Sequence, residues 1–140
     1  MVQFGLAFDF RNPARWRVPW DTFYRRTLDQ IVYAEQLGFD SIWLTEHHFV
    51  DDGYSPSPMT IAAAIAVLTK RVLIGTVVLL LPFYNPIRLA EDAATVDILS
   101  GGRFLLGVGQ GYRPTEFTPF GIPMQERLGR YLEGLEVIRQ

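Results

Sequence analysis

The 140-residue sequence contains no cysteine, which excludes disulfide bonds, thiolate metal sites and cysteine nucleophiles. This absence is compatible with a reducing cytoplasm. An excess of positive charge is also lacking, because 13 lysines and arginines face 15 aspartates and glutamates, for a net charge of -2. Proteins that bind nucleic acid or an anionic membrane usually carry a basic patch. We therefore expect a small-molecule or protein partner, with no nucleic acid and no membrane.

Long hydrophobic runs are missing as well. The most apolar stretch, residues 72–81, has about half of the roughly 20 residues that a membrane-spanning helix needs, and Pro82 ends it. The beginning of the sequence lacks the basic segment and the small-residue cleavage site of a signal peptide. These features predict a cytoplasmic protein.

What the sequence does contain is a regular alternation of two kinds of segment, short apolar runs typical of buried strands and longer stretches with helical spacing of apolar residues. The strand-like runs are residues 2–10, 41–45, 72–81 and 103–108, and the helical stretches are 21–37, 58–69, 86–100 and 128–138. Because the strand runs are too uniformly apolar for a sheet with one wet face, they favour a parallel sheet. The 49% of hydrophobic residues suits a single packed domain over residues 1–140.

Local signals mark the ends of the predicted helices. Asp21 has the side chain of an N-cap for the first helix. The pairs Ser57-Pro58 and Asn85-Pro86 combine a capping side chain with a first-turn proline. Gly38 and the Gly101-Gly102 pair supply the residues that end the first and third helices. The expected order is therefore strand then helix, four times.

Four such units could form a small open sheet or one half of a closed barrel. An open nucleotide-binding sheet favours a glycine-rich turn after its first strand, and this sequence has residues 9–13, Asp-Phe-Arg-Asn-Pro, at that place. In a (β/α)8 barrel the chemistry lies at the C-terminal ends of the strands, which is where residues 46–48, 82–84 and 109–111 fall. We therefore predict the first four βα units of a (β/α)8 TIM barrel, a half barrel.

The two histidines of the sequence, His47 and His48, stand behind Glu46 at the end of the second predicted strand. Imidazole is the side chain best suited to moving protons near neutral pH, and Glu46 could bias its charge or tautomer. Because neighbouring strand residues point to opposite faces, at most one histidine should face the barrel mouth. A metal site is not expected, since the chain has no other histidine or cysteine to complete one. From the residues alone, catalytic and structural roles both stay open.

The segment Gly107-Val-Gly-Gln-Gly111 follows the fourth predicted strand. Glycine lets a ligand approach the backbone, because no Cβ stands in the way. Without a matched acidic residue or a phosphate-binding lysine it is no nucleotide signature, and by itself it is typical of a turn.

A series of landmarks together resembles one known family. The string Trp43-Leu-Thr-Glu-His-His-Phe49 is similar to the segment after the second strand in luciferase-like flavin monooxygenases. Further landmarks follow in the same order, and they are Gly75-Thr76 leading to Leu81-Pro82, Asn85-Pro-Ile-Arg-Leu-Ala-Glu-Asp92, Ser100-Gly-Gly-Arg-Phe104 and Phe120-Gly121. The resemblance covers nearly the whole chain.

This resemblance implies a (β/α)8 barrel that binds reduced FMN, or in some branches the deazaflavin F420, at its C-terminal mouth. It gives the catalytic role to His47, with His48 and Glu46 beside it. The strand-three bulge of the family, commonly with a non-prolyl cis peptide against which the flavin ring rests, maps to Val77 and Val78. Contacts to the flavin and its phosphate tail map to Gly109 and Gln110. Some members have an arginine where this chain has Gln110, whose amide cannot pair charge with a phosphate.

The Glu-His-His-Phe form is more similar to the FMN-using branch. The implied activity is a monooxygenase that uses reduced FMN and oxygen on an aldehyde or other small organic substrate, with an F420-dependent reductase as the second enzyme candidate. A non-catalytic flavin-binding or partner subunit and an inactive fragment are the alternatives. Such barrels have about 250 residues, so we expect an apparently truncated chain that self-associates into oligomers or needs a missing C-terminal half.

Overall fold

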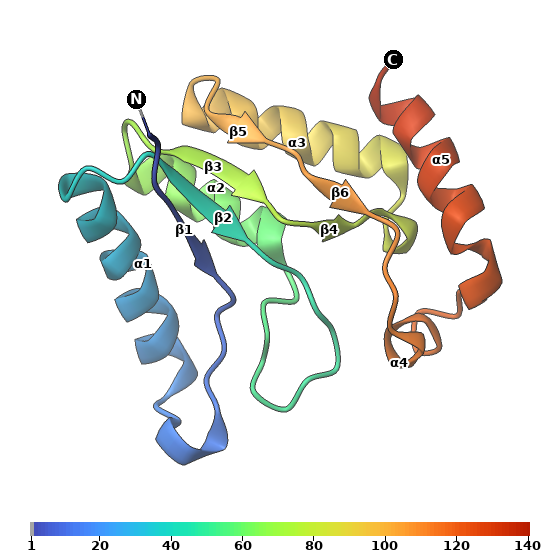
Figure 1. Cartoon of the computed structure of the whole chain (residues 1–140), viewed down its shortest axis with the longest axis horizontal. Coiled ribbons are helices and arrows are strands. Elements are labelled where there is room, and N and C mark those ends of the chain that lie inside the picture. Colours follow the sequence, from blue (N-terminus) through green and yellow to red (C-terminus); the bar gives the residue numbers. More distant parts are fainter. Residues whose placement is uncertain (1) are drawn as a thin grey trace.

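The computed structural model describes residues 2–140 and alternates strands with helices along the whole chain (Figure 1). The strands are β1 (Gly5–Phe8), β2 (Ser41–Leu44), β3 (Leu73–Thr76), β4 (Leu79–Leu80), β5 (Phe104–Leu105) and β6 (Val108–Gly109). The helices are α1 (Trp20–Gln36), α2 (Pro58–Leu68), α3 (Pro86–Ser100), α4 (Pro114–Phe117) and α5 (Arg127–Ile138), and 3-10 turns cover Ala14–Trp16, Leu81–Phe83 and Met124–Glu126. This order agrees with the predicted succession of four βα units.

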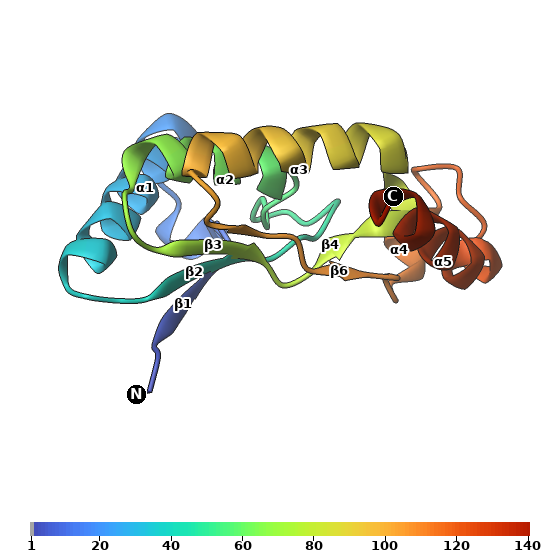
Figure 2. The same cartoon turned by 90° about the horizontal axis from the view of Figure 1, so that it is seen from above.

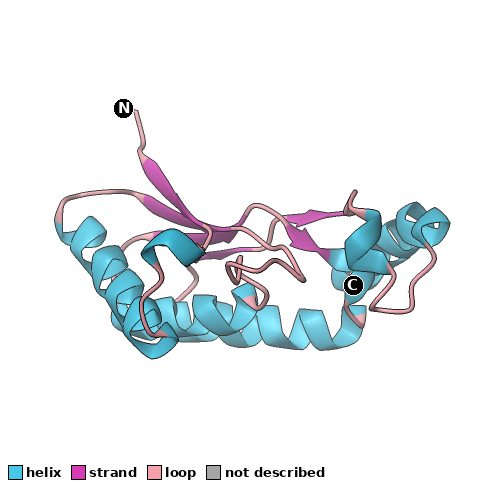
Figure 3. Ribbon diagram, turned by 90° about the horizontal axis from the view of Figure 1, so that it is seen from below, coloured by secondary structure: helices cyan, strands magenta, loops and turns pink. Residues whose placement is uncertain are grey.

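The strands form two parallel sheets that follow one another in space. The larger sheet has the order β1-β2-β3-β5, and β4 pairs with β6 beyond its C-terminal end. Helices α1, α2 and α3 cover one face of these strands, and the opposite face is left open (Figure 2). Figure 3 shows the same layers from below, with α5 beside the β4-β6 end of the molecule. One-sided helix cover of a parallel sheet is the arrangement expected of part of a barrel.

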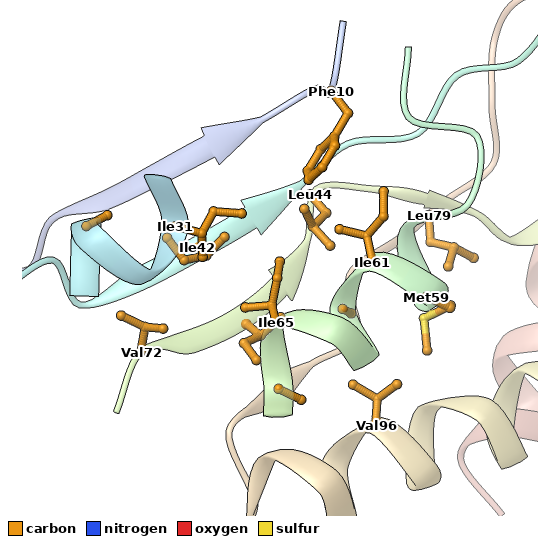
Figure 4. Close-up of a cluster of buried hydrophobic side chains, with 14 of the residues drawn as sticks. Phe10, Ile31, Ile42, Leu44, Met59, Ile61, Ile65, Val72, Leu79 and Val96 are labelled. Carbon is orange, nitrogen blue, oxygen red and sulfur yellow. The ribbon is translucent and has the colours of Figure 1, made fainter. Parts of the chain in front are cut away.

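The hydrophobic core lies between the sheet and the helices (Figure 4). Ile42 and Leu44 of β2 point into it, and both are fully buried against residues such as Ile65 of α2. Trp43, between them in sequence, points to the open face, because side chains alternate along a strand. There it lies over Gly75, its partner on β3, where an added Cβ would come within 2.3 Å of the indole.

Two long predicted strands are in fact interrupted. Residues 72–81 form β3 and β4 with a break at Val77 and Val78, and residues 103–108 divide into β5 and β6. The peptide bond between Val77 and Val78 is cis. The irregular backbone with a non-prolyl cis bond, predicted at this position, is therefore confirmed.

Most of the predicted helix signals are confirmed. Ser57 and Asn85 occupy the N-cap positions of α2 and α3. The Asn85 side chain accepts hydrogen bonds from the N–H groups of Ile87 and Arg88, whereas the Ser57 side chain makes no capping hydrogen bond. Asp21 is not an N-cap, because α1 already begins at Trp20, after Pro19. Asp21 instead lies in the first turn, where its negative charge complements the helix dipole.

Helices long and apolar enough to cross a membrane are absent from residues 2–140.

Candidate functional site

A pocket of about 370 Å³ lies at the C-terminal ends of β2 and β3 and beside the β4-β6 pair. Its walls are formed by Thr45, Glu46, His47, Tyr54, Val77, Val78, Leu80, Gly109, Gln110, Gly111 and Tyr112. This volume is within the range of roughly 300–1,000 Å³ typical of small-molecule sites. Of the predicted site residues, only His48 is not part of this lining. The fold therefore brings residues from four separate segments of the chain to one hollow.

His47 contributes an imidazole to the pocket. Its Nδ1 atom lies 2.7 Å from Oε1 of Glu116, a carboxyl group that is 1% exposed. The same Oε1 atom accepts a hydrogen bond of 3.1 Å from the backbone N–H of His48. Arg113 approaches this oxygen to 3.7 Å. Glu116 thus fixes the His47 ring and the adjoining peptide together.

Glu46 is the partner of His48 and not of His47. One carboxyl oxygen of Glu46 lies 2.8 Å from Nε2 of His48 and accepts a hydrogen bond of 2.7 Å from the hydroxyl of Tyr84, while the other accepts one of 2.5 Å from the N–H of Leu80. Glu46 and His48 therefore contact each other, whereas the ring of His47 contacts Glu116. Glu46, which could bias an imidazole according to the sequence, contacts that of His48.

His48 belongs to a second pocket of about 280 Å³, whose lining includes Glu46, Ser57 and Tyr84. Its ring is surrounded by Phe49, Phe83 and Phe120, at centroid distances of 6.0, 5.6 and 4.9 Å. Burial raises the pKa of Tyr84, and the negative charge of Glu46 raises it further, so the phenol keeps the proton that it donates to this carboxylate. The two neighbouring histidines consequently open onto different hollows.

Two tyrosines flank the His47 ring within the first pocket. Tyr54 and Tyr112 both approach it nearly edge-on, with centroid distances of 4.7 and 6.0 Å. Tyr54 is held from the other side by the guanidinium of Arg11, 5.4 Å from the ring centroid. The His47 side chain itself is 17% exposed.

The opposite side of the pocket is apolar and open to solvent. Val77 and Val78 are 47% and 39% exposed, which is unusual for valines that follow a central strand. Beside them, Gly109 has no room for a side chain, since an added Cβ would come within 2.6 Å of Cγ2 of Val78. The valines and this glycine therefore form a wall on which a flat ring could lie.

Sequence reasoning missed Glu116, Tyr54 and Tyr112, whereas Tyr84 lies in one of the strand-end segments that it singled out. Glu116 is 69 residues from His47 and lies on the short helix α4, and nothing in its local sequence distinguishes it from a surface glutamate. Elsewhere in residues 2–140, as around this pocket, no three histidine, aspartate or glutamate side chains gather closely enough to hold a metal ion.

Known proteins resemble this chain over nearly its whole length. A model of the luciferase-like monooxygenase family matches residues 2–140. The uncharacterised protein y4vJ of Sinorhizobium fredii is 39% identical over 114 residues, which are 81% of this chain and 32% of that protein. The 4-hydroxyprotoasukamycin monooxygenase of Streptomyces nodosus subsp. asukaensis is 36% identical over 115 residues, 82% of this chain and 31% of the relative. The chain thus spans about a third of the length of these curated relatives.

Solved structures give the same picture. The monooxygenase RslO1 from Streptomyces bottropensis superposes with a TM-score of 0.90 at 36% identity, over 99% of this chain and 42% of the other. The oxygenating constituent of 3,6-diketocamphane monooxygenase from Pseudomonas putida, in complex with FMN, superposes with a TM-score of 0.86 at 25% identity. The match covers 97% of this chain and 38% of the other. An F420-dependent secondary alcohol dehydrogenase superposes with a TM-score of 0.77 at 26% identity, and the match covers 98% of this chain and 41% of the other. The α/β fold with a parallel sheet is confirmed, and it corresponds to about two fifths of such structures, as expected of a partial barrel.

Proposed function

We propose that this chain, which belongs to the luciferase-like monooxygenase family, provides the flavin-facing site of an oxidoreductase that uses reduced FMN and oxygen on an aldehyde or other small organic substrate. The observation that supports this most is the composition of the 370 Å³ pocket. His47, Val77, Val78, Gly109 and Gln110 were assigned to flavin chemistry from the sequence, and all of them line this one hollow.

The residues of the pocket fit the ring system of a flavin better than its phosphate tail. The exposed faces of Val77 and Val78 offer an apolar surface for a flat aromatic ring, and the absence of a side chain at Gly109 leaves room for that ring beside them. Neither lysine nor arginine is among the lining residues, and Gln110 can offer only a neutral amide to a phosphate. We therefore assign ring binding to this chain and expect the phosphate to be anchored outside this pocket.

Reduced FMN bound here would supply two electrons to oxygen, so that one oxygen atom enters the substrate and the other leaves as water. The task of His47 is to accept or release a proton at Nε2, since Nδ1 is occupied by Glu116. Tyr54 and Tyr112 contact the imidazole and help to orient it. Position-specific proton transfer of this kind typically contributes about 10²- to 10⁴-fold to a rate.

F420 is the second candidate cofactor, because a structure of an F420-dependent secondary alcohol dehydrogenase superposes on 98% of this chain. A deazaflavin ring would rest on the same valines. An F420 enzyme would transfer hydride without consuming oxygen, so oxygen uptake separates the two activities. A flavin-binding subunit without turnover is the non-enzymatic alternative.

The experiment is a pair of measurements on the 140-residue chain. Quenching of flavin fluorescence measures FMN binding, and oxygen uptake with enzymatically supplied reduced FMN and a series of aldehydes measures turnover, with mass spectrometry for the carboxylic acid product. We expect His47→Ala to retain FMN binding and lose about 10²-fold or more in turnover. His48→Ala serves as the matched control, because its ring opens onto the other pocket.

Three outcomes contradict the proposal in different ways. Bound FMN without substrate-dependent oxygen uptake would favour the non-catalytic subunit. Turnover with F420 and none with FMN would favour the reductase. Equal losses of turnover in the two histidine variants would contradict the assignment of His47.

A further inference from the structure

The two histidines contact buried carboxyl groups through different ring nitrogens. His47 uses Nδ1 toward Oε1 of Glu116, at 2.7 Å. His48 uses Nε2 toward Oε1 of Glu46, at 2.8 Å. Both carboxyl groups are almost fully buried, at 1% and 3% exposure, and they come from segments 70 residues apart. Adjacent residues of one type are therefore held in two distinct ways.

The other partners of these carboxyl groups show that they act as hydrogen-bond acceptors. Oε1 of Glu116 receives the backbone N–H of His48, and Oε2 of Glu46 receives that of Leu80. A backbone N–H can only donate. Tyr84, whose pKa is raised by burial, also donates its hydroxyl proton to Glu46. Because these carboxyl groups act as acceptors toward their other partners, we take the ring nitrogen that faces each of them to be the donor.

We propose that Glu116 and Glu46 are positioning residues that hold the two histidines in opposite neutral tautomers, His47 protonated at Nδ1 and His48 protonated at Nε2. The imidazole lone pair of His47 is then on Nε2, and that of His48 is on Nδ1. Neither of these two nitrogens has a hydrogen-bond partner within residues 2–140, and neither is sealed off as a buried unpartnered atom. Each lone pair is thus available to the hollow that its own ring lines.

In this arrangement only one of the two adjacent histidines, His47, provides a basic ring nitrogen for the first pocket. The ring of His47, with its lone pair on Nε2, lines the pocket with Val77, Val78 and Gly109, and the ring of His48, with its lone pair on Nδ1, lines the pocket with Ser57 and Tyr84. The tautomers follow from the hydrogen bonds alone. That His47 uses its lone pair on substrate or flavin rests on the proposed function.

The tautomers can be measured without any cofactor. Histidine labelled with ¹⁵N in the 140-residue chain gives separate ring-nitrogen signals in long-range ¹H–¹⁵N spectra, and the two residues are assigned by comparison with His48→Gln. At about pH 8 we expect His47 to be protonated at Nδ1 and His48 at Nε2. Any other combination in the unmodified chain, including the same tautomer on both rings, would overturn the proposal.

Two isosteric variants test the cause of the effect. Glu116→Gln replaces an acceptor by an amide that can donate or accept, so the tautomer ratio at His47 should change by about 10-fold or more, with that of His48 unchanged. Glu46→Gln is the matched control and should change His48 alone. A ratio at His47 that stays constant in Glu116→Gln would refute the positioning role.

Activity adds an independent readout. If the proposed function is correct, Glu116→Gln should reduce turnover at saturating flavin while leaving FMN affinity within about 2-fold, because Glu116 is not among the lining residues of the first pocket. The expected tautomers in a chain that binds no flavin would contradict the proposed function and leave the tautomer assignment standing. Unchanged turnover in a Glu116→Gln enzyme whose His47 tautomer has shifted would contradict the use of His47 as a base.

Discussion

Gly109 is the position at which a single methyl group should alter the candidate flavin site most directly. In Gly109→Ala the new Cβ would lie 2.6 Å from Cγ2 of Val78 and 3.5 Å from its Cβ. Carbon atoms in contact lie about 3.5–4.0 Å apart, so one valine methyl must move by roughly 1 Å. Valine has a stiff χ1 angle and cannot rotate away at low cost. The displacement therefore reaches the pocket wall.

The magnitude follows from the cost of overpacking. Forcing an extra methyl group into a packed site costs about 1–3 kcal/mol, which lowers the melting temperature of a domain of this size by roughly 3–10 °C. If the displaced Val78 methyl group also weakens the binding free energy of the flavin ring by about 1–2 kcal/mol, the dissociation constant for FMN rises by roughly 5- to 30-fold.

The assay combines thermal unfolding with the FMN fluorescence titration. Gly129→Ala is the matched control, because Gly129 lies in α5 with no atom near its missing Cβ. It should leave FMN binding unchanged and raise stability by up to about 1 kcal/mol, the difference in helix propensity. The double variant Gly109→Ala with Val78→Ala should regain part of the lost stability, since the clashing methyl is gone.

Equal melting temperatures and equal FMN affinities of Gly109→Ala and the unmodified chain would refute the steric explanation. Loss of affinity that persists in the double variant at full stability would instead assign the effect to Val78 itself.

Three further predictions concern the fold. Because β1 and β5 are the outer strands of the larger sheet, and Phe4 and Leu105 are exposed near them, we expect the purified chain to self-associate. A molar mass from light scattering that stays at the 16.0 kDa of the monomer over a wide concentration range would contradict this. Arg103→Met should lower the free energy of unfolding, measured by chemical denaturation, by about 2–4 kcal/mol, because the guanidinium donates to the carbonyl oxygens of Ala66, Thr69 and Val72. A loss below about 1 kcal/mol would show that these hydrogen bonds are dispensable. Glu35 is partly desolvated, which raises its pKa, but hydrogen bonds from the N–H groups of residues 70–72 outweigh this and leave the pKa lowered. A lowered pKa contributes stability that is fully present above the ordinary glutamate pKa of about 4.3 and is lost as the pH falls through the pKa of the folded state. The difference in stability between the unmodified chain and Glu35→Gln should therefore shrink below about pH 4. A difference that does not depend on pH would contradict this.

Much of the fold was predictable because its signals are local. The capping side chain of Asn85 acts on N–H groups two and three residues ahead, and Gly101 ends α3 with a positive φ of 69°. Alternation along β2 places Ile42 and Leu44 on one side and Trp43 on the other. Interactions of this kind are complete within a few residues, so the sequence window contains both partners.

The residues of the candidate site were in part predictable too. The motif around His47 and the position of the break at Val77 and Val78 came from a resemblance that covers nearly the whole chain, and the cis peptide agrees with it. The breaks in the strands at residues 77–78 and 106–107 shift pairing from one sheet to the other. Uniform apolar composition gives no sign of such a shift, because the residues on both sides of each break are similarly apolar.

What the sequence by itself determined is the order of elements, the ends of the helices, the family resemblance and the set of residues near the strand ends. Which carboxyl group each histidine contacts was decided only in three dimensions. The sequence placed Glu46 beside both histidines without choosing between them, and the structure pairs it with His48. Glu116 reaches His47 because β6 and the following loop carry α4 back over the end of β2, a contact across 69 residues that depends on the packing of the whole sheet and not on any local pattern.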